Sequence, residues 1–276
     1  MPEGPEIRLA ADQLERAIAG KKLLGVYFKF DALKPYENQL AASRVLGFET
    51  RGKALLTHFS CGLSVYSHNQ LYGLWKISKT GTIPTGTRDL RFSVTAKDRQ
   101  ALLFSASDIS VLATTEVASH PFIRKLGPDV LDNKLSANML YQRLTLPQFS
   151  GKSVAGLLLD QGFLAGMGNY LRSEVLFEAQ IAPKACPKSL SESARQRLAQ
   201  ALIEVPQRSY LSHGVTNLRA LADARPIVQR GQSEYETYRF AIFERDGLPC
   251  YECCTPIERI EIGSRRLYFC PRCQAA

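Results

Sequence analysis

The C-terminal cysteines most strongly constrain how this chain can fold. Cys250 and Cys253 form one Cys-x-x-Cys pair, Cys270 and Cys273 form a second, and sixteen residues separate the two pairs. Two such pairs at this separation are typical of a zinc ribbon, in which each pair lies on a tight turn and the intervening segment is long enough for a β-hairpin. We therefore expect one structural zinc ion, bound by these four thiolates in a closed site that holds shape and does no chemistry.

The remaining cysteines fit this metal site less well. Cys254 follows Cys253 directly and would point away from the tetrahedron, so we expect it not to bind the ion, with ligand exchange as the alternative. Cys61 and Cys186 are isolated, and we interpret them as buried small apolar residues. A redox dithiol needs only one pair and explains the pattern less well. The chain begins Met-Pro-Glu-Gly-Pro-Glu, which is not a secretory signal, so we expect a reducing, cytoplasmic environment.

The charge of the chain indicates a class of partner. Lysine and arginine outnumber aspartate and glutamate by 35 to 26, which gives a net charge of +9 and a pI near 9.2. This surplus favours nucleic acid over an anionic membrane as a partner, and the alternative is a protein that is basic without either. With 45% hydrophobic and 22% charged residues, the composition excludes disordered and fibrous proteins. The most apolar segment, 154–167, is interrupted by Asp160 and glycines, so we expect no transmembrane helix.

The first half of the chain reads as one helix followed by short strands. Apolar residues recur at three- and four-residue steps from Pro5 to Ala19, which predicts a helix that stops at Gly20. Strand-like runs separated by Gly, Pro, Asn and Asp then occupy 26–30, 54–59, 63–66, 71–77, 90–95 and 101–104. Many short strands at this spacing predict an antiparallel sandwich or barrel.

The second half turns helical after a connector over 118–135. The last of the expected helices opens with Ser189 and Glu192 at capping-box spacing. The stretch over 213–236 has weak periodicity and mixed charge, so we interpret it as a loop or linker. The tail over 238–273 has β-propensity around the paired cysteines. The expected helices cover 137–146, 152–161, 170–179 and 189–203.

The N-terminus offers its own chemistry. Met1 before Pro2 is normally removed, because a small second residue permits cleavage, and Pro2 is left with a free secondary amine. An α-amine has a pKa of about 7.7–8, against about 10.4 for lysine, so a useful fraction is nucleophilic at physiological pH. The positive end of the helix that starts at Pro5 favours the neutral amine further. Such an amine attacks an aldehyde-like carbon to form an iminium ion, with Glu3 and Glu6 near enough to transfer protons, although many proteins begin Met-Pro without such a role.

A glycine-rich segment and two shorter ones each have a functional and a structural interpretation. Gly166 and Gly168 precede a helix whose N-terminus, with Asn169, would hold a nucleic-acid phosphate; otherwise the segment is an ordinary helical hairpin turn. Lys53, after Arg51-Gly52, is a charge at the start of a hydrophobic strand, which usually means a solvated strand edge. The trio over 70–72, Gln-Leu-Tyr, is either core strand or, in a protein that flips bases, a group that fills the gap in the stack.

Taken together, these motifs resemble the formamidopyrimidine-DNA glycosylase/endonuclease VIII family. The resemblance rests on MPEGPEI at 1–7, ETRGKALL at 49–56, GMGNY at 166–170 and the four-cysteine ribbon, which occur in the family's order over nearly the whole chain. The glycine in MPEGPEI and the Gln-Leu-Tyr trio are similar to the endonuclease VIII branch in particular.

The resemblance implies a fold and a function. The fold would be α+β and multidomain, with an N-terminal antiparallel β-sandwich and flanking helix (1–130), a helix–two-turn–helix domain (131–236) and a zinc-ribbon hairpin (237–276). The function would be that of a bifunctional DNA glycosylase and abasic-site lyase in base excision repair. The endonuclease VIII branch implies excision of oxidised pyrimidines from duplex DNA and cleavage by β,δ-elimination. We expect a bacterial, cytoplasmic, nucleoid-associated monomer that binds damaged double-stranded DNA and one zinc ion, and no membrane.

Carried over by position, the resemblance also implies catalytic roles. Pro2 would be the Schiff-base nucleophile at C1′ of the damaged nucleotide, and Glu3 would be the proton donor or shuttle. Lys53 would contact phosphate and assist β-elimination. Arg265, at the tip of the ribbon hairpin, would hold the phosphate and serve δ-elimination.

DNA contacts are implied at five further positions. Gln70, Lys125 and Asn169 would bind DNA. Leu71 and Tyr72, beside Gln70, would occupy the space that the everted base vacates.

Three departures from the family pattern concern the finger and its connector. Cys254 stands where the family usually has glycine, and Arg266 follows Arg265 directly, so these two arginines could share or exchange their role. The segment 214–236 is longer than the usual connector. None of these departures touches Pro2 or Glu3.

Three alternative functions remain at this point. A non-catalytic DNA-binding protein with a zinc ribbon explains the charge and the cysteines, but it does not explain Pro2, Glu3 and Lys53 together. A glycosylase of the formamidopyrimidine type would use the same chemistry on oxidised purines. A lyase that acts only on abasic sites is the third.

Overall fold

The computed structural model describes residues 2–222 and 232–275, and its chain contacts divide it into two compact units. The first unit contains Pro2 and Glu6–Lys125. The second contains Glu3–Pro5 and the chain from Leu126 onward. The three-part division at 130/131 and 236/237 stays a prediction. Met1, whose removal we expect, lies outside the described residues.

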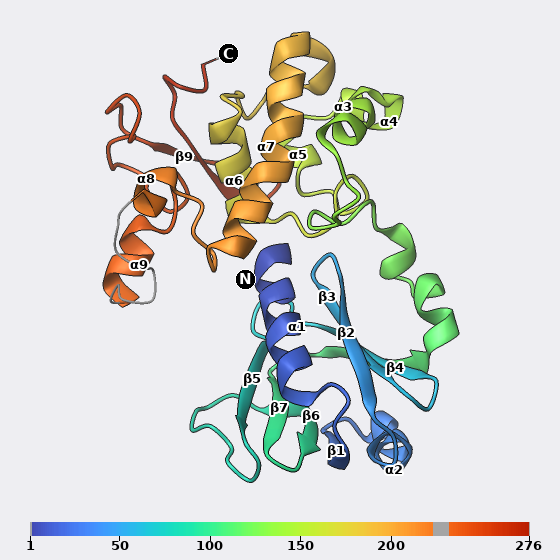
Figure 1. Cartoon of the computed structure of the whole chain (residues 1–276). Coiled ribbons are helices and arrows are strands. Elements are labelled where there is room, and N and C mark those ends of the chain that lie inside the picture. The colour runs from blue at the N-terminus through green and yellow to red at the C-terminus, as the bar shows by residue number, and fades with distance from the viewer. Residues whose placement is uncertain (1, 223–231, 276) are drawn as a thin grey trace. The chain divides into compact units, whose positions relative to one another are not determined.

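The first unit is a sandwich of two antiparallel four-stranded sheets, drawn in blue to green in Figure 1. One sheet has the order β1-β6-β7-β5 and the other the order β2-β3-β4-β8. The predicted antiparallel sandwich is therefore confirmed. Its strands are β1 (Leu23–Phe28), β2 (Val45–Arg51), β3 (Ala54–Phe59), β4 (Leu63–His68), β5 (Leu74–Lys79), β6 (Leu90–Ala96), β7 (Arg99–Phe104) and β8 (Asp108–Ala113).

Helix α1 (Gly4–Ile18) supplies one apolar stripe to the core of this sandwich. Ile7, Leu14 and Ile18 lie on that stripe and are buried, as the three- and four-residue spacing predicted. Burial of each such side chain stabilises the fold by about 2 kcal/mol. Within the same core, the rings of Phe28 and Phe92 stack with centroids 4.8 Å apart.

Three strands and two cysteines differ from the prediction. Strands β2 and β8 were not predicted, because most of their side chains are half-buried and no clean alternation marks them. Strand β5 begins at Leu74 rather than at 71, so the Gln-Leu-Tyr trio lies in a loop. Cys61 and Cys186 are half-buried rather than buried. Short helical segments η1 (Asp31–Tyr36), α2 (Glu37–Ala41), η2 (Thr114–Ser119) and η3 (Ile123–Lys125) complete the unit.

The second unit is helical and carries the C-terminal hairpin (Figure 1). Its apolar core is formed mainly by α3, α6 and α7, with Leu140, Leu171 and Leu198 fully buried. Its elements are α3 (Ala137–Thr145), α4 (Pro147–Ser150), α5 (Val154–Leu157), α6 (Asn169–Glu178), η4 (Pro187–Ser189), α7 (Glu192–Leu211), α8 (Leu218–Leu221), α9 (Gln232–Tyr238), β9 (Glu258–Ile262) and β10 (Arg265–Phe269).

Two helix predictions and one loop prediction for this unit were wrong in part. Over 152–161 only α5 is helical, because the Asp160 carboxylate accepts the Gly162 amide at 2.9 Å and stabilises a turn instead. Helix α7 begins after Ser191, whose hydroxyl accepts the Ala194 amide, so the Ser189 capping box does not form. The segment interpreted as a loop over 213–236 contains α8 and the start of α9, and residues 223–231 lie outside the described residues.

The predicted ribbon hairpin is confirmed. Strands β9 and β10 pair antiparallel, with Arg265 opposite Ile262. Gly263 and Ser264 join them with φ of 61° and 57°, as in a type I′ turn, which matches the twist of the two strands. Arg265 therefore begins its strand directly after the turn. Among the described residues, no helix is long and apolar enough to cross a membrane.

Candidate functional site

Glu3 is an acidic side chain bound by the N-terminus of a helix in the second unit. Its side chain is 1% exposed. One carboxylate oxygen accepts the Tyr170 amide at 2.8 Å, and the other accepts the Leu171 amide at 3.2 Å. Both amides belong to the first turn of α6, where unpaired N–H groups and the positive end of the helix dipole favour an anion. The predicted anion site at this helix start therefore holds a carboxylate of the chain itself.

The glycine-rich turn before α6 makes this close approach possible. The Gly4 amide donates to the Gly166 carbonyl at 2.9 Å. Gly166 has a φ of +97°, in the left-handed region that favours glycine. A Cβ at Gly168 would lie 2.3 Å from the Glu3 carboxyl carbon. The turn is therefore built to receive the N-terminal segment and is more than an ordinary helical hairpin turn.

Two polar side chains that no sequence pattern indicated form hydrogen bonds to the backbone of this turn. The Gln161 amide accepts from Gly166 N at 3.1 Å and donates to Met167 O at 2.9 Å. The Arg143 guanidinium donates to the carbonyls of Phe163 and Gly162 at 2.7 and 2.6 Å. These bonds fix the backbone that carries Gly166.

Pro2 lies next to Glu3 along the chain and is half-buried. It is grouped with the first unit, whereas Glu3 is grouped with the second.

Lys53 lies at the turn between β2 and β3 in the first unit. Gly52 has a φ of +60°, and Lys53 follows it with only 9% of its surface exposed. The interpretation of Lys53 as a solvated strand-edge charge is therefore wrong. Next to it, Arg51 pairs with Glu49 at 2.6 Å, and the other Glu49 oxygen contacts His58 Nε2 at 3.0 Å.

The loop that contains Gln70, Leu71 and Tyr72 presents two apolar side chains to solvent. Leu71 is 64% and Tyr72 69% exposed, so the core-strand interpretation is wrong. Gln70 has a φ of +51°, and its side-chain oxygen accepts the Ser107 hydroxyl at 2.7 Å. The Arg88 guanidinium donates to the Tyr72 carbonyl. An exposed apolar pair on an anchored loop can enter an apolar gap in a partner at little cost in backbone ordering.

Asn169, at the start of α6, is linked to the finger hairpin through a buried arginine. The Asn169 side-chain oxygen accepts from Arg172 Nη2 at 2.7 Å, and the same nitrogen donates to the Arg266 carbonyl at 2.9 Å. Arg172 is fully buried, and burial, followed by the charge of Arg265, lowers its pKa to about 10. The side chains of Arg265 and Arg266 are both exposed.

The sequence interpretation missed Arg172 and Glu174, both of which tie α6 to the finger. The Glu174 carboxylate is 3% exposed and accepts the backbone amides of Ile242 and Phe243 at 2.8 and 2.9 Å. The sequence does carry a signal, because these two charged residues stand among the apolar residues of the predicted helix. All side chains over 170–176, theirs included, are buried. Buried charges are retained where they have partners.

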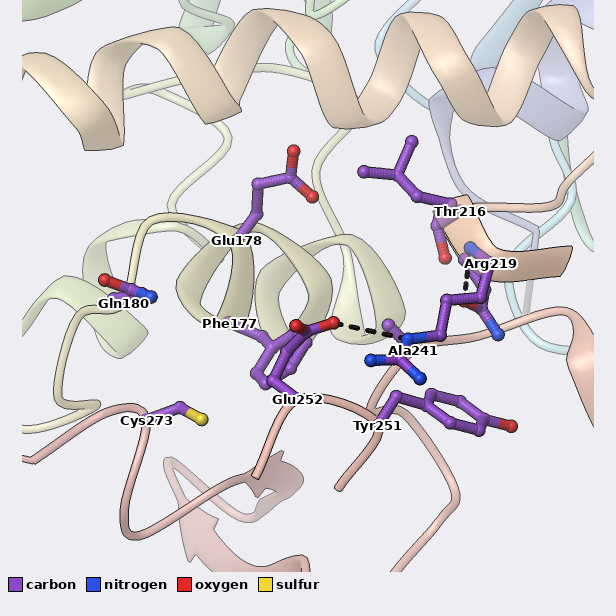
Figure 2. Close-up of a pocket in the computed structure, with 11 residues that line it drawn as sticks. Phe177, Glu178, Gln180, Thr216, Arg219, Ala241, Tyr251, Glu252 and Cys273 are labelled. Atoms are coloured by element: carbon purple, nitrogen blue, oxygen red, sulfur yellow. Dashed lines mark hydrogen bonds and ion pairs between the residues drawn. The ribbon is translucent and has the colours of Figure 1, made fainter. Parts of the chain in front are cut away.

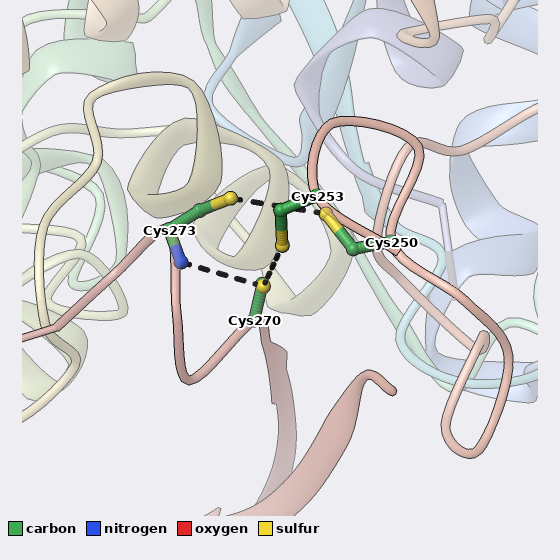
Figure 3. Close-up of side chains that lie close together, drawn as sticks. All are labelled: Cys250, Cys253, Cys270 and Cys273. Carbon is green, nitrogen blue, oxygen red and sulfur yellow. Dashed lines mark hydrogen bonds between the residues drawn. The ribbon is translucent and has the colours of Figure 1, made fainter. Parts of the chain in front are cut away.

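The four predicted cysteine ligands come together in one cluster (Figure 3). Their sulfur atoms all lie within 4.8 Å of one another. Cys250 Sγ lies 3.9 Å from Cys273 Sγ, and Cys253 Sγ lies 3.4 Å from Cys270 Sγ. A tetrahedral zinc site with Zn–S bonds of about 2.3 Å places its sulfurs about 3.8 Å apart, so the cluster fits a structural metal ion.

Cys254 stays outside this cluster. It is exposed, and its φ of +61° lies in the left-handed region that favours glycine.

A separate pocket of about 320 Å³ lies beside the finger in the second unit (Figure 2). Arg219 and Glu252 pair across it at 3.5 Å, and the Arg219 guanidinium stacks on Tyr251. Of the predicted site residues, only Cys273 lines it. Lys125 lies elsewhere, exposed at the end of η3 in the first unit.

Family models match the chain in three places. The formamidopyrimidine-DNA glycosylase N-terminal domain matches residues 1–107, and the formamidopyrimidine-DNA glycosylase H2TH domain matches residues 126–218. The zinc finger found in FPG and IleRS matches residues 247–276.

Whole-chain relatives extend this match. The endonuclease 8 proteins of Salmonella arizonae and Escherichia coli K12 are each 47% identical over 274 residues, which is 99% of this chain and 100% of theirs. Formamidopyrimidine-DNA glycosylase of Lactococcus lactis, solved with DNA containing an abasic site, aligns with a TM-score of 0.81 at 21% identity over 99% of this chain and all of that one. MutM, solved with DNA containing carbocyclic 8-oxo-G, has the same TM-score at 22% identity, with full coverage of both chains.

A β-sandwich, an H2TH region and a four-cysteine hairpin, in one chain that matches these relatives end to end, define a DNA-repair enzyme that is both glycosylase and abasic-site lyase. Such enzymes act in base excision repair. The chain belongs to the formamidopyrimidine-DNA glycosylase/endonuclease VIII family.

Proposed function

We propose that this enzyme excises oxidised pyrimidines from duplex DNA through a Schiff base on Pro2 and cleaves the strand by β,δ-elimination. The main support is the position of the Glu3 carboxylate, which is buried and accepts two backbone amides. Glu3 follows Pro2 directly in the chain. Such a fixed carboxylate, next to a nucleophile, suits proton transfer during attack. The preference for pyrimidines is supported by the 47% identity to endonuclease 8 proteins over the full chain.

The Pro2 nitrogen would attack C1′ of the damaged nucleotide. The bond from C1′ to the base breaks, its electron pair leaves with the base, and the base takes up a proton for which Glu3 is the donor or shuttle. The attacking nitrogen loses its proton, and its lone pair then breaks the C1′–O4′ bond. O4′ takes up a proton as the sugar ring opens, and the iminium ion that remains at C1′ acts as an electron sink. Removal of a C2′ proton then expels the 3′ phosphate, and removal of a C4′ proton expels the 5′ phosphate. Water finally releases the sugar fragment from Pro2.

Phosphate contacts are proposed for Lys53 and Arg265. Lys53 is nearly buried at the β2–β3 turn, so its ammonium is held in place with little freedom, which suits a fixed phosphate contact during β-elimination. Arg265 extends from the hairpin next to the turn and would hold the phosphate that leaves in δ-elimination. Asn169 and Lys125 are proposed as further DNA contacts. Arg266, exposed beside Arg265, is available to share its role.

Base eversion would involve the exposed loop. Taking a base out of the stack costs a few kcal/mol, and stacking of Leu71 and Tyr72 in the gap would recover part of that cost. Gln70 would contact DNA from the same loop.

One structural zinc ion is proposed for the cysteine cluster. Cys250, Cys253, Cys270 and Cys273 would hold it, and the donor set of four sulfurs selects zinc among the common structural ions. The ion would hold the turns on which the β9–β10 hairpin rests, and it would take no part in the reaction.

The partner and the setting follow from the same family. We propose damaged double-stranded DNA as the substrate and a monomer in the bacterial cytoplasm as the working form. The DNA-bound states of two structural relatives and the net charge of +9 support the first of these.

A lesion panel tests the proposal directly. Duplexes carrying thymine glycol, an oxidised purine opposite cytosine, or a preformed abasic site are compared for base release and for strand ends. We expect release of thymine glycol above the oxidised purine, and a gap with phosphate at both ends. Preferential release of the purine would favour the formamidopyrimidine-type alternative, and cleavage only at the abasic site would favour the simple lyase.

A further inference from the structure

Two histidines in the first unit accept hydrogen bonds from a backbone amide two residues further along the chain. His68 Nδ1 accepts from Gln70 N at 3.0 Å, and His120 Nδ1 accepts from Phe122 N at 3.3 Å. A backbone N–H can only donate, so both Nδ1 atoms must be unprotonated and each neutral ring carries its proton on Nε2. The geometry is that of an Asx turn, with imidazole in place of the asparagine oxygen.

We call each of these histidine–amide hydrogen bonds a cap. The His68 cap, from Gln70 N to His68 Nδ1, lies at the base of the loop that presents Leu71 and Tyr72. It holds Gln70 in a left-handed conformation, which is unfavourable for a residue with a Cβ and needs support from its surroundings. The other supports are the Ser107 hydroxyl on the Gln70 side chain and the Asn69 carbonyl, which accepts from Gly73 N at 2.7 Å. Among these, the His68 bond is the one that a proton can break.

The surroundings of His68 come from β3, β8, the β2–β3 turn and the segment between η2 and η3. In the sheet register His68 lies between Ala54 of β3 and Asp108 of β8, and the edge of its ring meets Phe122 at 5.2 Å. Burial lowers the pKa of His68 most; the Lys53 ammonium lowers it further, and Asp108 raises it. Burial also lowers the pKa of His120.

Tyr66 links the second cap to the same cluster. The His120 ring stacks on the Tyr66 ring with centroids 4.0 Å apart. The Tyr66 hydroxyl donates to Asp108, and burial raises the pKa of this phenol, which keeps it neutral. Asp108 raises the pKa of His120, as it does that of His68. Phe122 joins the caps, because His120 holds its amide and His68 meets its ring.

We propose that His68 is a positioning residue for DNA insertion, and that it holds the loop over 70–72 in its inserting conformation only while its Nδ1 is unprotonated. The proposal rests on the function proposed above, since it assigns a control to the loop that fills the stack. Protonation would replace the acceptor with a second donor facing the Gln70 amide, and it would set a cation near Lys53. The loop would then lose its anchor. Excision from duplex DNA would fall relative to excision from single strands.

The direction of the pH effect follows from the burial of the neutral ring. The ordinary value for histidine is 6.5, and the pKa of His68 is below it. The neutral cap therefore predominates at pH 7 and above, and it is lost as the pH falls below 6.5 through the lower pKa of the folded protein. Excision from duplex DNA should fall over that acidic range more steeply than excision from single strands.

The cap can be tested without DNA. In the full-length chain labelled with ¹⁵N, we expect the neutral Nε2–H tautomer of His68 at pH 8, and a Gln70 amide shift that follows the His68 titration. His68→Asn keeps an acceptor but cannot titrate, so the Gln70 amide should become insensitive to pH. His120→Asn is the matched control. It should make the Phe122 amide shift insensitive to pH and leave the pH dependence of the Gln70 amide shift in place. An Nδ1–H tautomer of His68, or a Gln70 titration that survives in His68→Asn, would overturn the proposal.

Activity on matched duplex and single-stranded substrates then tests positioning. At pH 8, His68→Asn should excise from duplex DNA within about twofold of the parent, because the Asx turn is kept. His68→Leu should lose about fivefold on duplex DNA, the worth of one hydrogen bond, with little loss on single strands. In His68→Asn the acidic fall on duplex DNA should become no steeper than the fall on single strands. Equal losses of His68→Leu on both substrates, or a duplex fall that stays steeper in His68→Asn, would refute a positioning role.

These two measurements separate the present proposal from the proposed function. If Leu71→Ala impairs both substrates equally, the insertion role fails, yet the tautomer and the Gln70 titration still decide the cap. If the cap fails, the Schiff-base chemistry on Pro2 is untouched.

Discussion

Glu3 owes its fixed position to the backbone around it and to the absence of a side chain at Gly168. The two α6 amides bind both of its oxygens, and no Cβ stands between the carboxyl group and the turn. In its proposed role as proton donor, Glu3 would gain from such preorganisation, because small displacements of a reacting group reduce the rate sharply.

Replacement of Gly168 by alanine should therefore impair base excision without unfolding the enzyme. The new Cβ would lie 2.3 Å from the Glu3 carboxyl carbon and would displace it. We expect base excision to fall about a hundredfold, as for a reacting group moved by about 1 Å, and cleavage of a preformed abasic site to fall less. The matched control is Gly151→Ala, where an added Cβ meets nothing within 4 Å, and it should retain full activity. Full activity of Gly168→Ala would mean that Glu3 does not need this position.

The exposed loop makes a second prediction at this scale. Leu71→Ala and Tyr72→Ala should impair excision in duplex DNA more than in single strands, because a single strand has no stack to refill. Rates on the two substrates, measured for each variant and for the parent, give the ratio directly. Since both side chains are exposed, loss of stability is not expected to contribute. A ratio unchanged from the parent would argue against insertion.

At the scale of elements, α6 contacts both Glu3 and the finger hairpin. Its first turn binds Glu3, its second carries Arg172 toward the carbonyls of β10, and Glu174 binds the backbone that leads into the finger. The cysteine cluster holds the other end of the same hairpin. Loss of the metal should therefore change where Arg265 lies, without a direct effect on Glu3.

Metal content distinguishes the proposed ligands from their neighbour. We expect one zinc per chain in the parent and in Cys254→Ser, and loss of zinc with weaker DNA binding in Cys253→Ser. The two serine variants differ by one position and remove the same atom, so they control for each other. Zinc retained in Cys253→Ser and lost in Cys254→Ser would reverse the ligand choice.

How much could be predicted from sequence differed between elements for physical reasons. Helix α1 and the ribbon hairpin were predicted because a strong apolar stripe and a fixed cysteine spacing encode them locally. The helix expected over 152–161 failed because its apolar residues are buried on all sides and carry no period, while Asp160 favours a turn. Strand β8 gave no alternation because its side chains are uniformly half-buried.

The cysteine cluster was predictable because four thiols at this spacing imply a metal site. The catalytic roles of Pro2 and Glu3, which rest on the N-terminal position and the family resemblance, stay predictions. The roles of Gln161, Arg143 and Arg172 depend on which carbonyls the fold brings within reach of their side chains, and no spacing in the sequence carries that information. The exposure of Leu71 and the burial of Lys53 likewise depend on where β5 and β3 begin.

At the scale of the whole molecule, the net charge of +9 makes DNA binding dependent on salt. Counterions released from phosphates set the slope of affinity against salt, whereas contacts to the lesion set the preference among substrates. The proposed phosphate contacts can be separated from lesion recognition on this basis.

Lys53→Ala and Arg265→Ala should each lower activity on every lesion to a similar degree. Each should also flatten the salt dependence of binding by about one unit of slope, as expected for one lost phosphate contact. Lys188→Ala, which removes an exposed lysine with no proposed role, serves as the control and should leave the slope unchanged. A variant that altered lesion preference while the slope stayed intact would place that residue at the base.

The central claim is that the Pro2 amine forms the covalent intermediate, and borohydride trapping followed by peptide mapping tests it most directly. Reduction during turnover on a duplex with one oxidised pyrimidine should fix the sugar remnant to the tryptic peptide Pro2–Arg8, at its N-terminal nitrogen. A chain that retains Met1, or carries residues ahead of Pro2, should neither trap DNA nor release the base. An adduct on another amine, or trapping by a chain with a blocked N-terminus, would contradict the account.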